Sequence, residues 1–303
     1  MNVALPSRIT LWEAGPRDGL QNEPGVVSTE VKVELIDRLV DCGITHVEAT
    51  SFVSPKWVPQ MGDHNEVMAQ LKPRPGVTYQ VLTPNMKGYE AARAAGAQAV
   101  GIFAAASESF SRKNINCSVE ESIERFRPVV EAAKRDGVKV RGFVSVVVGC
   151  PFEGEIAPQQ TARVVKQMYD LGCNDIGLGD TIGVGTPGKV KAMIKACARD
   201  VPLEVLGGHF HDTYGQALAN TLAALECGVA RHDASVAGLG GCPYAPGATG
   251  NVATEDLVYM LDGLGIETGI DLKKLVQTAW WISDRLGRPP VSRVARALKS
   301  KCL

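Results

Sequence analysis

The sequence lacks several features that mark large classes of proteins. Its 303 residues carry a formal net charge of −1, so there is no basic field to hold nucleic acid or an anionic membrane. No apolar run approaches the roughly 20 residues that a membrane span needs. We therefore expect neither a nucleic acid nor a membrane among the partners of this chain.

The eight cysteines include no C-x-x-C pair. Scattered cysteines in a chain of this size favour reduced, mostly buried thiols over a disulfide framework or a zinc site. Only a few residues precede the first apolar segment, at 9–12, which leaves no room for a targeting peptide. Both observations lead us to expect a cytoplasmic protein.

Short apolar segments alternate with amphipathic segments eight times along the chain. The apolar segments predict strands, and the amphipathic ones, such as 28–42, predict helices. The predicted strands are 8–12, 46–50, 78–82, 99–104, 138–148, 175–178, 203–206 and 233–236. Alternating strands and helices imply a parallel sheet, and eight units indicate an α/β fold of the closed (β/α)8 TIM-barrel type. An open doubly wound sheet is the alternative.

Such a barrel uses about 250 residues, so the chain fits a single catalytic domain, 1–303. The barrel itself is expected at about 8–265. The C-terminal extension, about 271–303, would hold a further helix at 272–286 and a short basic tail. That helix could pack under the barrel or against a second subunit, and we expect a homodimer or a larger homo-oligomer.

Polar side chains gather at the predicted carboxyl ends of the strands, where this fold places its chemistry. They are Arg17, Asp18, Glu48, Asp180, His209, His211 and Asn251, with Arg141 inside the fifth strand. Each one alone has a structural explanation. Asp18 could cap a turn, Asn251 could cap the next helix, and Glu48 could be a satisfied, half-buried carboxylate. Their joint placement at one end of the barrel favours a functional site.

His209 and His211 stand one residue apart, so their side chains project from one face of a strand and Phe210 from the other. On its own the pair fits a solvated strand end as well as a metal site. Together with Asp18 and Asn251 it makes a set of nitrogen and oxygen donors without a thiolate. That set suits Mg²⁺ or Mn²⁺, with zinc or cobalt as alternatives.

No predicted strand ends in a lysine, which argues against Schiff-base chemistry and for metal-assisted chemistry. Arg17 would add a fixed cation that could hold an oxygen on which negative charge develops. A G-x-G-x-x-G match at 183–188 follows the sixth strand and not the first. It therefore favours a tight turn over a dinucleotide-binding site. The glycine-rich segment 235–251 predicts a mobile loop, and Cys242 within it is a proton donor or a small loop residue.

The chain resembles the hydroxymethylglutaryl-CoA lyases in four segments, 15–22, 48–61, 209–220 and 238–244. The arginine–aspartate turn and the H-x-H pair also occur in metal-dependent relatives that condense acyl-CoA with 2-oxo acids. The Ser-Phe-Val-Ser-Pro-Lys-Trp and Gly-Leu-Gly-Gly-Cys-Pro motifs are much more specific to the lyases. The resemblance covers nearly the whole chain.

The resemblance implies that 3-hydroxy-3-methylglutaryl-CoA is cleaved to acetyl-CoA and acetoacetate with the help of Mg²⁺ or Mn²⁺. The implied metal ligands are Asp18, His209, His211 and Asn251. The implied catalytic residues are Arg17, Glu48, Asp180, His209 and Cys242. The implied substrate-binding residues are Arg17, Gln21, Ser51, Asn114 and Arg141. Arg17 would stabilise the reacting oxygens, Glu48 and Asp180 would shape the polar network and move protons, and Cys242 would transfer a proton.

Two other functions were weighed against the lyase. One is an enzyme that acts on a related 3-hydroxyacyl-CoA or works in the condensing direction, as Claisen-type synthases do. The other is an inactive barrel that binds metal as a scaffold. A missing ligand or a missing Cys242 would favour the scaffold, and neither is missing.

Overall fold

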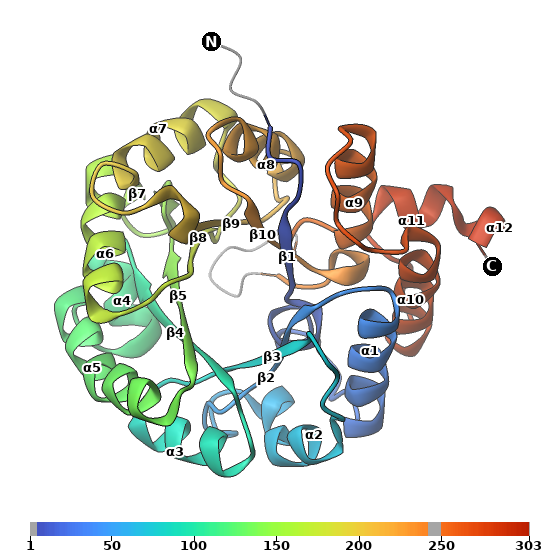
Figure 1. Cartoon of the computed structure of the whole chain (residues 1–303), viewed down its shortest axis with the longest axis horizontal. Helices are drawn as coiled ribbons and strands as arrows, with labels where there is room; N and C mark the ends of the chain where they lie inside the picture. Colours follow the sequence, from blue (N-terminus) through green and yellow to red (C-terminus); the bar gives the residue numbers. More distant parts are fainter. Residues whose placement is uncertain (1–4, 242–249, 303) are drawn as a thin grey trace.

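Eight parallel strands close into a barrel with helices around the outside (Figure 1). The structure is a computed structural model that describes residues 5–241 and 250–302. The barrel strands are β1 (Thr10–Glu13), β2 (His46–Ser51), β3 (Thr78–Leu82), β4 (Ala99–Ala105), β5 (Lys139–Ser145), β8 (Ile176–Asp180), β9 (Leu206–Phe210) and β10 (Arg231–Ala234). Neighbours follow the order of the chain, and β1 closes the barrel against β10. The predicted (β/α)8 barrel is confirmed.

Helices follow the strands and form the outer layer (Figure 1). They are α1 (Thr29–Asp41), α2 (His64–Gln70), α3 (Met86–Ala94), α4 (Glu108–Ile115), α5 (Val119–Asp136), α6 (Pro158–Leu171), α7 (Pro187–Cys197), α8 (Ala217–Glu226) and α9 (Thr254–Gly263). Several begin at a residue that the sequence marks. Ser28 caps α1, and Ser118 forms a capping box with Glu121 at the start of α5. Such caps satisfy backbone N–H groups that have no partner within the helix.

The segment through Asn114 was predicted as a loop, but most of it is the helix α4. The Ser107 side chain caps this helix by accepting a hydrogen bond from the Phe110 N–H at 3.1 Å. Phe110 is buried, whereas much of the rest of α4 is polar. So short a helix with so few apolar residues shows no clear amphipathic period, which is why the pattern missed it.

The predicted strand at 138–148 is too long, because β5 ends before Val146. The φ of Val146 is +55°, which takes the backbone out of the extended region. Its N–H donates to the Thr181 hydroxyl at 2.9 Å instead of to a neighbouring strand. The chain then forms a small antiparallel pair, β6 (Gly149–Cys150) and β7 (Gly154–Glu155).

The predicted seventh strand starts too early. Residues Leu203–Val205 form a 3-10 turn after a proline, and β9 begins only at Leu206. A Cβ atom at Gly208 would lie 2.7 Å from the Phe210 ring and 2.8 Å from His232 Nδ1. The strand therefore needs glycine here, and glycine is a residue that strand propensity counts against.

The C-terminal segment forms three helices, α10 (Leu272–Arg285), α11 (Arg293–Ala297) and α12 (Lys299–Cys302). The basic segment predicted as a tail is thus helical. Trp280 Nε1 donates to the carbonyl oxygen of Ala295 at 2.8 Å and ties α11 to α10. α10 packs beside α1 and α9 on the side of the barrel (Figure 1), and its packing against a second subunit stays a prediction.

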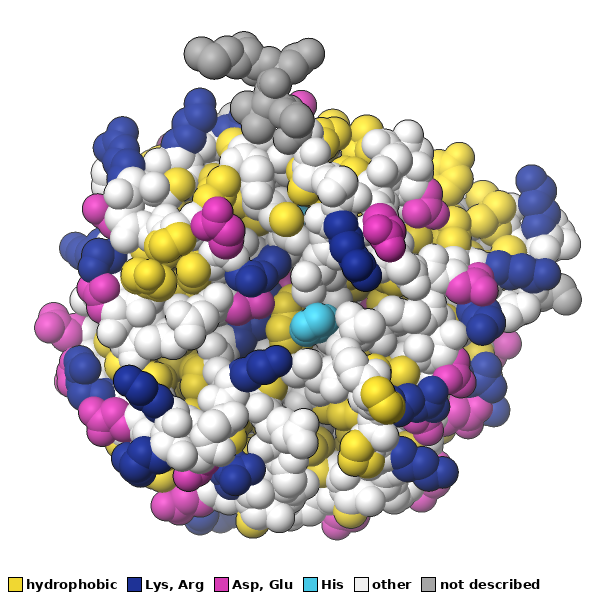
Figure 2. Space-filling model, viewed as in Figure 1, with side chains coloured by type: hydrophobic (Ala, Val, Ile, Leu, Met, Phe, Trp, Pro, Cys, Tyr) yellow, Lys and Arg dark blue, Asp and Glu magenta, His cyan; other side chains and the backbone are white. Residues whose placement is uncertain are grey.

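Basic and acidic side chains are interspersed over the face seen in Figure 2, as suits a net charge of −1. Seven cysteines lie within the described residues, and all seven are free. Five of them are buried, as the sequence predicted for most of the thiols. Within residues 5–241 and 250–302, no helix combines the length and the apolar character that crossing a membrane requires.

Gly43, which follows α1, gives a test of the packing. Its φ is +101°, and a Cβ atom there would lie 2.2 Å from the carbonyl oxygen of Gly269. Gly43→Ala is therefore expected to lower the free energy of unfolding by about 2 to 5 kcal/mol, as backbone strain and overpacking add. Gly96→Ala is the control, because Gly96 has a φ of +85° but open space around it. Equal losses in denaturant unfolding of both variants would show that the Gly269 contact is unimportant.

Candidate active site

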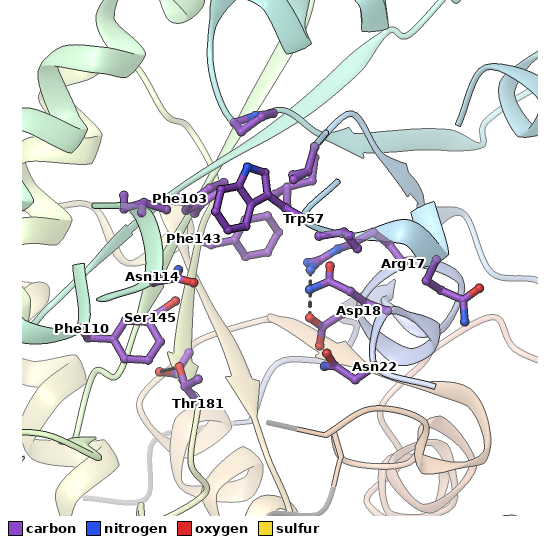
Figure 3. A pocket seen from close by; sticks show the side chains of 18 of the residues that line it. Arg17, Asp18, Asn22, Trp57, Phe103, Phe110, Asn114, Phe143, Ser145 and Thr181 are labelled. Atoms are coloured by element: carbon purple, nitrogen blue, oxygen red, sulfur yellow. Dashed lines mark hydrogen bonds and ion pairs between the residues drawn. The ribbon is translucent and has the colours of Figure 1, made fainter. Parts of the chain in front are cut away.

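A cavity of about 990 Å³ opens at the carboxyl ends of the barrel strands (Figure 3). Side chains from several strands line it. They include Arg17 and Asp18 after β1, Ser145 at the end of β5, Thr181 after β8 and His209 in β9. This end of the barrel is where the fold places reactive groups, so the cavity is the candidate active site.

Three predicted metal ligands, Asp18, His209 and His211, bring ligand atoms within 4.8 Å of one another. The fourth, Asn251, lies against them. Its Nδ2 donates to Asp18 Oδ2 at 2.8 Å, and its backbone pairs with that of His211. The barrel therefore gathers all four residues, although Asn251 is 233 positions from Asp18 in the chain.

The side chain of His211 is compatible with a cation in this cluster. Its buried Nδ1 has no hydrogen-bond partner within the part of the chain that the structure describes. Leaving a buried polar atom unpaired costs about 1 to 3 kcal/mol, a cost that coordination to a cation would remove. Burial, with the nearby charge of His209, lowers the pKa of His211 to about 4, so the imidazole is neutral and able to act as a ligand.

Arg17 lies between two carboxylates in the π-helical turn Gly15–Gly19 and the neighbouring strand. Its Nη1 contacts Asp18 Oδ1 at 2.9 Å, and its Nε and Nη2 contact Glu48 Oε2 at 2.8 and 2.6 Å. Burial opposes ionisation of Asp18, but the charge of Arg17, together with the two histidines and the hydrogen bond from Asn251, outweighs burial and holds the pKa of Asp18 below its usual range. Burial raises the pKa of Glu48 in spite of Arg17. The guanidinium is thus fixed at the edge of the cavity.

Asp180 ends β8 and is fully buried. Its carboxylate accepts hydrogen bonds from the N–H groups of Val184 and Gly185 at 3.1 and 2.8 Å. Burial raises the pKa of Asp180 to about 6 against these hydrogen bonds. The G-x-G-x-x-G match is therefore a turn built around a carboxylate, as expected. The role of Asp180 in moving protons stays a prediction.

Two predicted substrate-binding residues, Arg141 and Ser51, are not among the residues that line the cavity. Arg141 lies inside the barrel below it and donates to Asp175 at 2.9 Å and to Asp233 at 2.6 Å. Ser51 is fully buried at the end of β2 and accepts a hydrogen bond from the Val53 N–H. The lining of the cavity gives no support for a contact of either side chain with the substrate, so this part of the prediction stays a prediction.

Gln21 and Asn114 line the cavity, as their predicted role requires. Cys242 lies outside the described residues.

The sequence analysis missed the aromatic side chains of the cavity, which Figure 3 shows from close by. This side consists of Trp57, Phe103, Phe110 and Phe143. Trp57 is 84% exposed, so the cavity offers an apolar surface to a ligand from solvent.

Asp233 of β10 is a further residue that the sequence analysis missed. Its Oδ2 lies 2.8 Å from His209 Nδ1, and its Oδ1 accepts a hydrogen bond from Arg141. The only signal in the sequence is a carboxylate inside a predicted strand. Such a residue needs a buried partner, but a single sequence does not say which one.

Known proteins match the chain over almost its whole length. The HMGL-like family model matches residues 8–282. The chain belongs to the HMGL-like family. It is 59% identical to the mitochondrial hydroxymethylglutaryl-CoA lyase of Homo sapiens over 293 residues, which cover 97% of this chain and 90% of that protein. It is 60% identical to the lyase of Gallus gallus over 294 residues, or 97% and 99% of the two chains.

Solved structures of hydroxymethylglutaryl-CoA lyases share the barrel of this HMGL-like chain. The Pseudomonas aeruginosa lyase is 54% identical with a TM-score of 0.96, and the match covers 99% of this chain and 100% of that one. The Acinetobacter baumannii lyase, in complex with coenzyme A and 3-methylmalate, is 38% identical with a TM-score of 0.92 over 97% and 96%. The mitochondrial location in the names above belongs to those relatives, and a cytoplasmic location of this chain stays a prediction.

Proposed function

We propose that this HMGL-like protein cleaves 3-hydroxy-3-methylglutaryl-CoA to acetyl-CoA and acetoacetate in the cavity at the barrel mouth. One observation carries the proposal: the cluster of Asp18, His209 and His211 lies directly beside the Arg17 guanidinium. The reaction develops negative charge first on the tertiary hydroxyl oxygen and then on the thioester oxygen of the departing acetyl group. A cation site beside a fixed guanidinium matches both charges. The lyases among the relatives support the same reaction.

Asp18, His209, His211 and Asn251 would hold the divalent ion. We propose Mg²⁺ or Mn²⁺, because the donors are nitrogen and oxygen and include no thiolate. When bound there, the ion supplies a positive charge that makes a coordinated hydroxyl easier to deprotonate.

The side chains of the protein then act on the substrate. Arg17 holds the oxygen on which charge develops, and Glu48 keeps the guanidinium in place. The hydroxyl passes its proton to a base of the site, for which Glu48 and Asp180 are the predicted candidates. The electron pair of the C–C bond then passes to the acetyl thioester as the hydroxyl oxygen becomes the carbonyl oxygen of acetoacetate, and the thioester carbon takes up a proton. Cys242 is proposed to supply that second proton, and the catalytic role of His209 stays a prediction.

The cavity walls suit a CoA thioester. Phe103, Phe110 and Phe143 offer apolar surface for the pantetheine chain. Lys113 and Arg125 line the same cavity and would bring cations to the phosphate groups.

The test is acetoacetate release from 3-hydroxy-3-methylglutaryl-CoA by metal-stripped protein, before and after addition of Mg²⁺ or Mn²⁺. We expect release only after the addition, because the ion supplies several kcal/mol of charge stabilisation. Thermal unfolding of the stripped protein provides the control that it is folded. Absence of release with either ion would contradict the proposal and favour a related 3-hydroxyacyl-CoA or the condensing direction.

We also propose that the protein forms a homodimer or a larger homo-oligomer. Tyr259 and Leu264 at α9 and Val291 before α11 are exposed apolar side chains, and α9 contacts α11. Light scattering after size exclusion would measure the mass, and a monomer at micromolar concentration would contradict this.

A further inference from the structure

His209 is held from below by a carboxylate that belongs to the neighbouring strand. Asp233 Oδ2 lies 2.8 Å from His209 Nδ1, and Asp233 is only 3% exposed. β9 and β10 are paired at this very position, with His209 opposite Asp233. The contact is therefore set by two rigid barrel strands and not by a loop.

Arg141 fixes the carboxylate of Asp233 from the other side. Its Nη2 donates to Asp233 Oδ1 at 2.6 Å, and its Nε donates to Asp175 Oδ1 at 2.9 Å. The ring centroids of Trp12 and Phe143 lie 4.6 and 4.7 Å from Cζ of the Arg141 guanidinium. A guanidinium is always charged and only donates, so the Asp233 carboxylate next to it is an acceptor for His209 as well.

This contact decides which nitrogen of His209 carries the proton. A carboxylate at Nδ1 requires N–H at that atom, so in the neutral imidazole, the form that binds metal ions, the lone pair is on Nε2. Nε2 faces the cluster, 3.9 Å from Asp18 Oδ2. His211 differs, because its Nδ1 has no partner within residues 5–241 and 250–302. The two histidines are thus not equivalent: Nδ1 of His209 is held by a carboxylate, whereas Nδ1 of His211 is not.

We propose that Asp233 is a positioning residue that presents Nε2 of His209 to the metal ion, and that Arg141 fixes Asp233 for this task. Asp233 acts through His209 and touches no substrate. This proposal rests on the metal-dependent function proposed above. It also gives Arg141 a role that is separate from the substrate binding first predicted for it.

The first experiment is Mn²⁺ binding, measured by calorimetry, to the wild-type protein and to Asp233→Asn. Asparagine keeps the volume of the side chain. It cannot accept a hydrogen bond from His209 at one terminal atom and from Arg141 at the other, because its amide nitrogen only donates. We expect Mn²⁺ affinity to fall by about 10- to 100-fold, with activity partly rescued at high Mn²⁺. Unchanged affinity would overturn the proposal. Asp175→Asn is the matched control, because Asp175 also binds Arg141 but no histidine. The Mn²⁺ affinity of this variant should stay close to that of the wild-type protein.

A second measurement needs no variant. Nitrogen-15 NMR of the histidine rings in metal-free wild-type protein, at mildly alkaline pH, should show His209 with its proton on Nδ1. A proton on Nε2 would overturn the proposal, whether or not the lyase function holds.

If Asp233→Asn does not fold, Arg141→Lys replaces it in the Mn²⁺-binding experiment, because lysine keeps the charge but cannot bridge both carboxylates. We expect a smaller loss of Mn²⁺ affinity there, and no loss would contradict the role of Arg141.

Discussion

The Asp18→Asn variant is expected to lose Mn²⁺ binding and to release acetoacetate about 1,000-fold more slowly than the wild-type protein. Asp18 is the only carboxylate in the three-residue cluster that the structure describes, and its negative charge balances the cation. A bound ion is worth several kcal/mol of transition-state stabilisation, and each 1.36 kcal/mol corresponds to a factor of ten. Asparagine keeps the shape of the side chain, so the variant tests charge and not packing.

The measurements are steady-state release of acetoacetate at increasing Mn²⁺ and direct Mn²⁺ binding. Asp262→Asn is the control, because it removes one negative charge on α9, outside the cluster. The thermal transition of Asp18→Asn should fall only modestly, because Arg17 keeps Glu48 as an ion-pair partner and the Asp18 side chain is 22% exposed at the mouth. Unfolding of the variant instead would point to a structural metal.

Replacing Arg17 with glutamine is expected to lower kcat by about 100- to 1,000-fold while Mn²⁺ binding persists. That range is typical for removing one donor from a site that stabilises a developing oxyanion. The ligand atoms of Asp18, His209 and His211 remain in place in this variant. The effect should therefore appear in kcat at saturating Mn²⁺ and not in the affinity for the ion.

Stability complicates this variant, because Arg17 also neutralises the buried Glu48. Removing one partner of a buried ion pair costs about 3 to 5 kcal/mol. The double variant Arg17→Gln with Glu48→Gln removes both charges and should recover much of the stability without recovering kcat. Recovery of turnover in the double variant would show that Arg17 serves the fold and not the reaction.

The depth of a side chain in the barrel is what the sequence could not show. Alternation along β5 puts Arg141, Phe143 and Ser145 on the same side of the strand. Only Phe143 and Ser145 reach the cavity, while Arg141 lies one step too deep. The pleat predicts the face of the strand, but the position along the barrel axis depends on the register with neighbouring strands. The pleat alone therefore could not show that Arg141 lies outside the lining of the cavity.

The predictions that succeeded rest on patterns that are local in the chain. Strand and helix alternation is local, and so is the spacing that puts His209 and His211 on one side. Asp18 and Asn251 were found because strand ends meet at one rim in any parallel barrel. Asp233 was missed because its partner, His209, lies on another strand, and only the pairing of β9 with β10 shows the contact.

The closure of the barrel between β1 and β10 has a consequence for the order of synthesis. Arg17 and Asp18 are made long before Asn251, which follows 233 positions after Asp18. β1 gains one of its two neighbours, β10, only when the chain has been made as far as Arg231–Ala234. Contacts this distant in sequence form slowly. A nascent chain therefore holds only one of the four predicted ligands, Asp18, until His209 and His211 have been made, and the complete ion site can form only after Asn251 has been added.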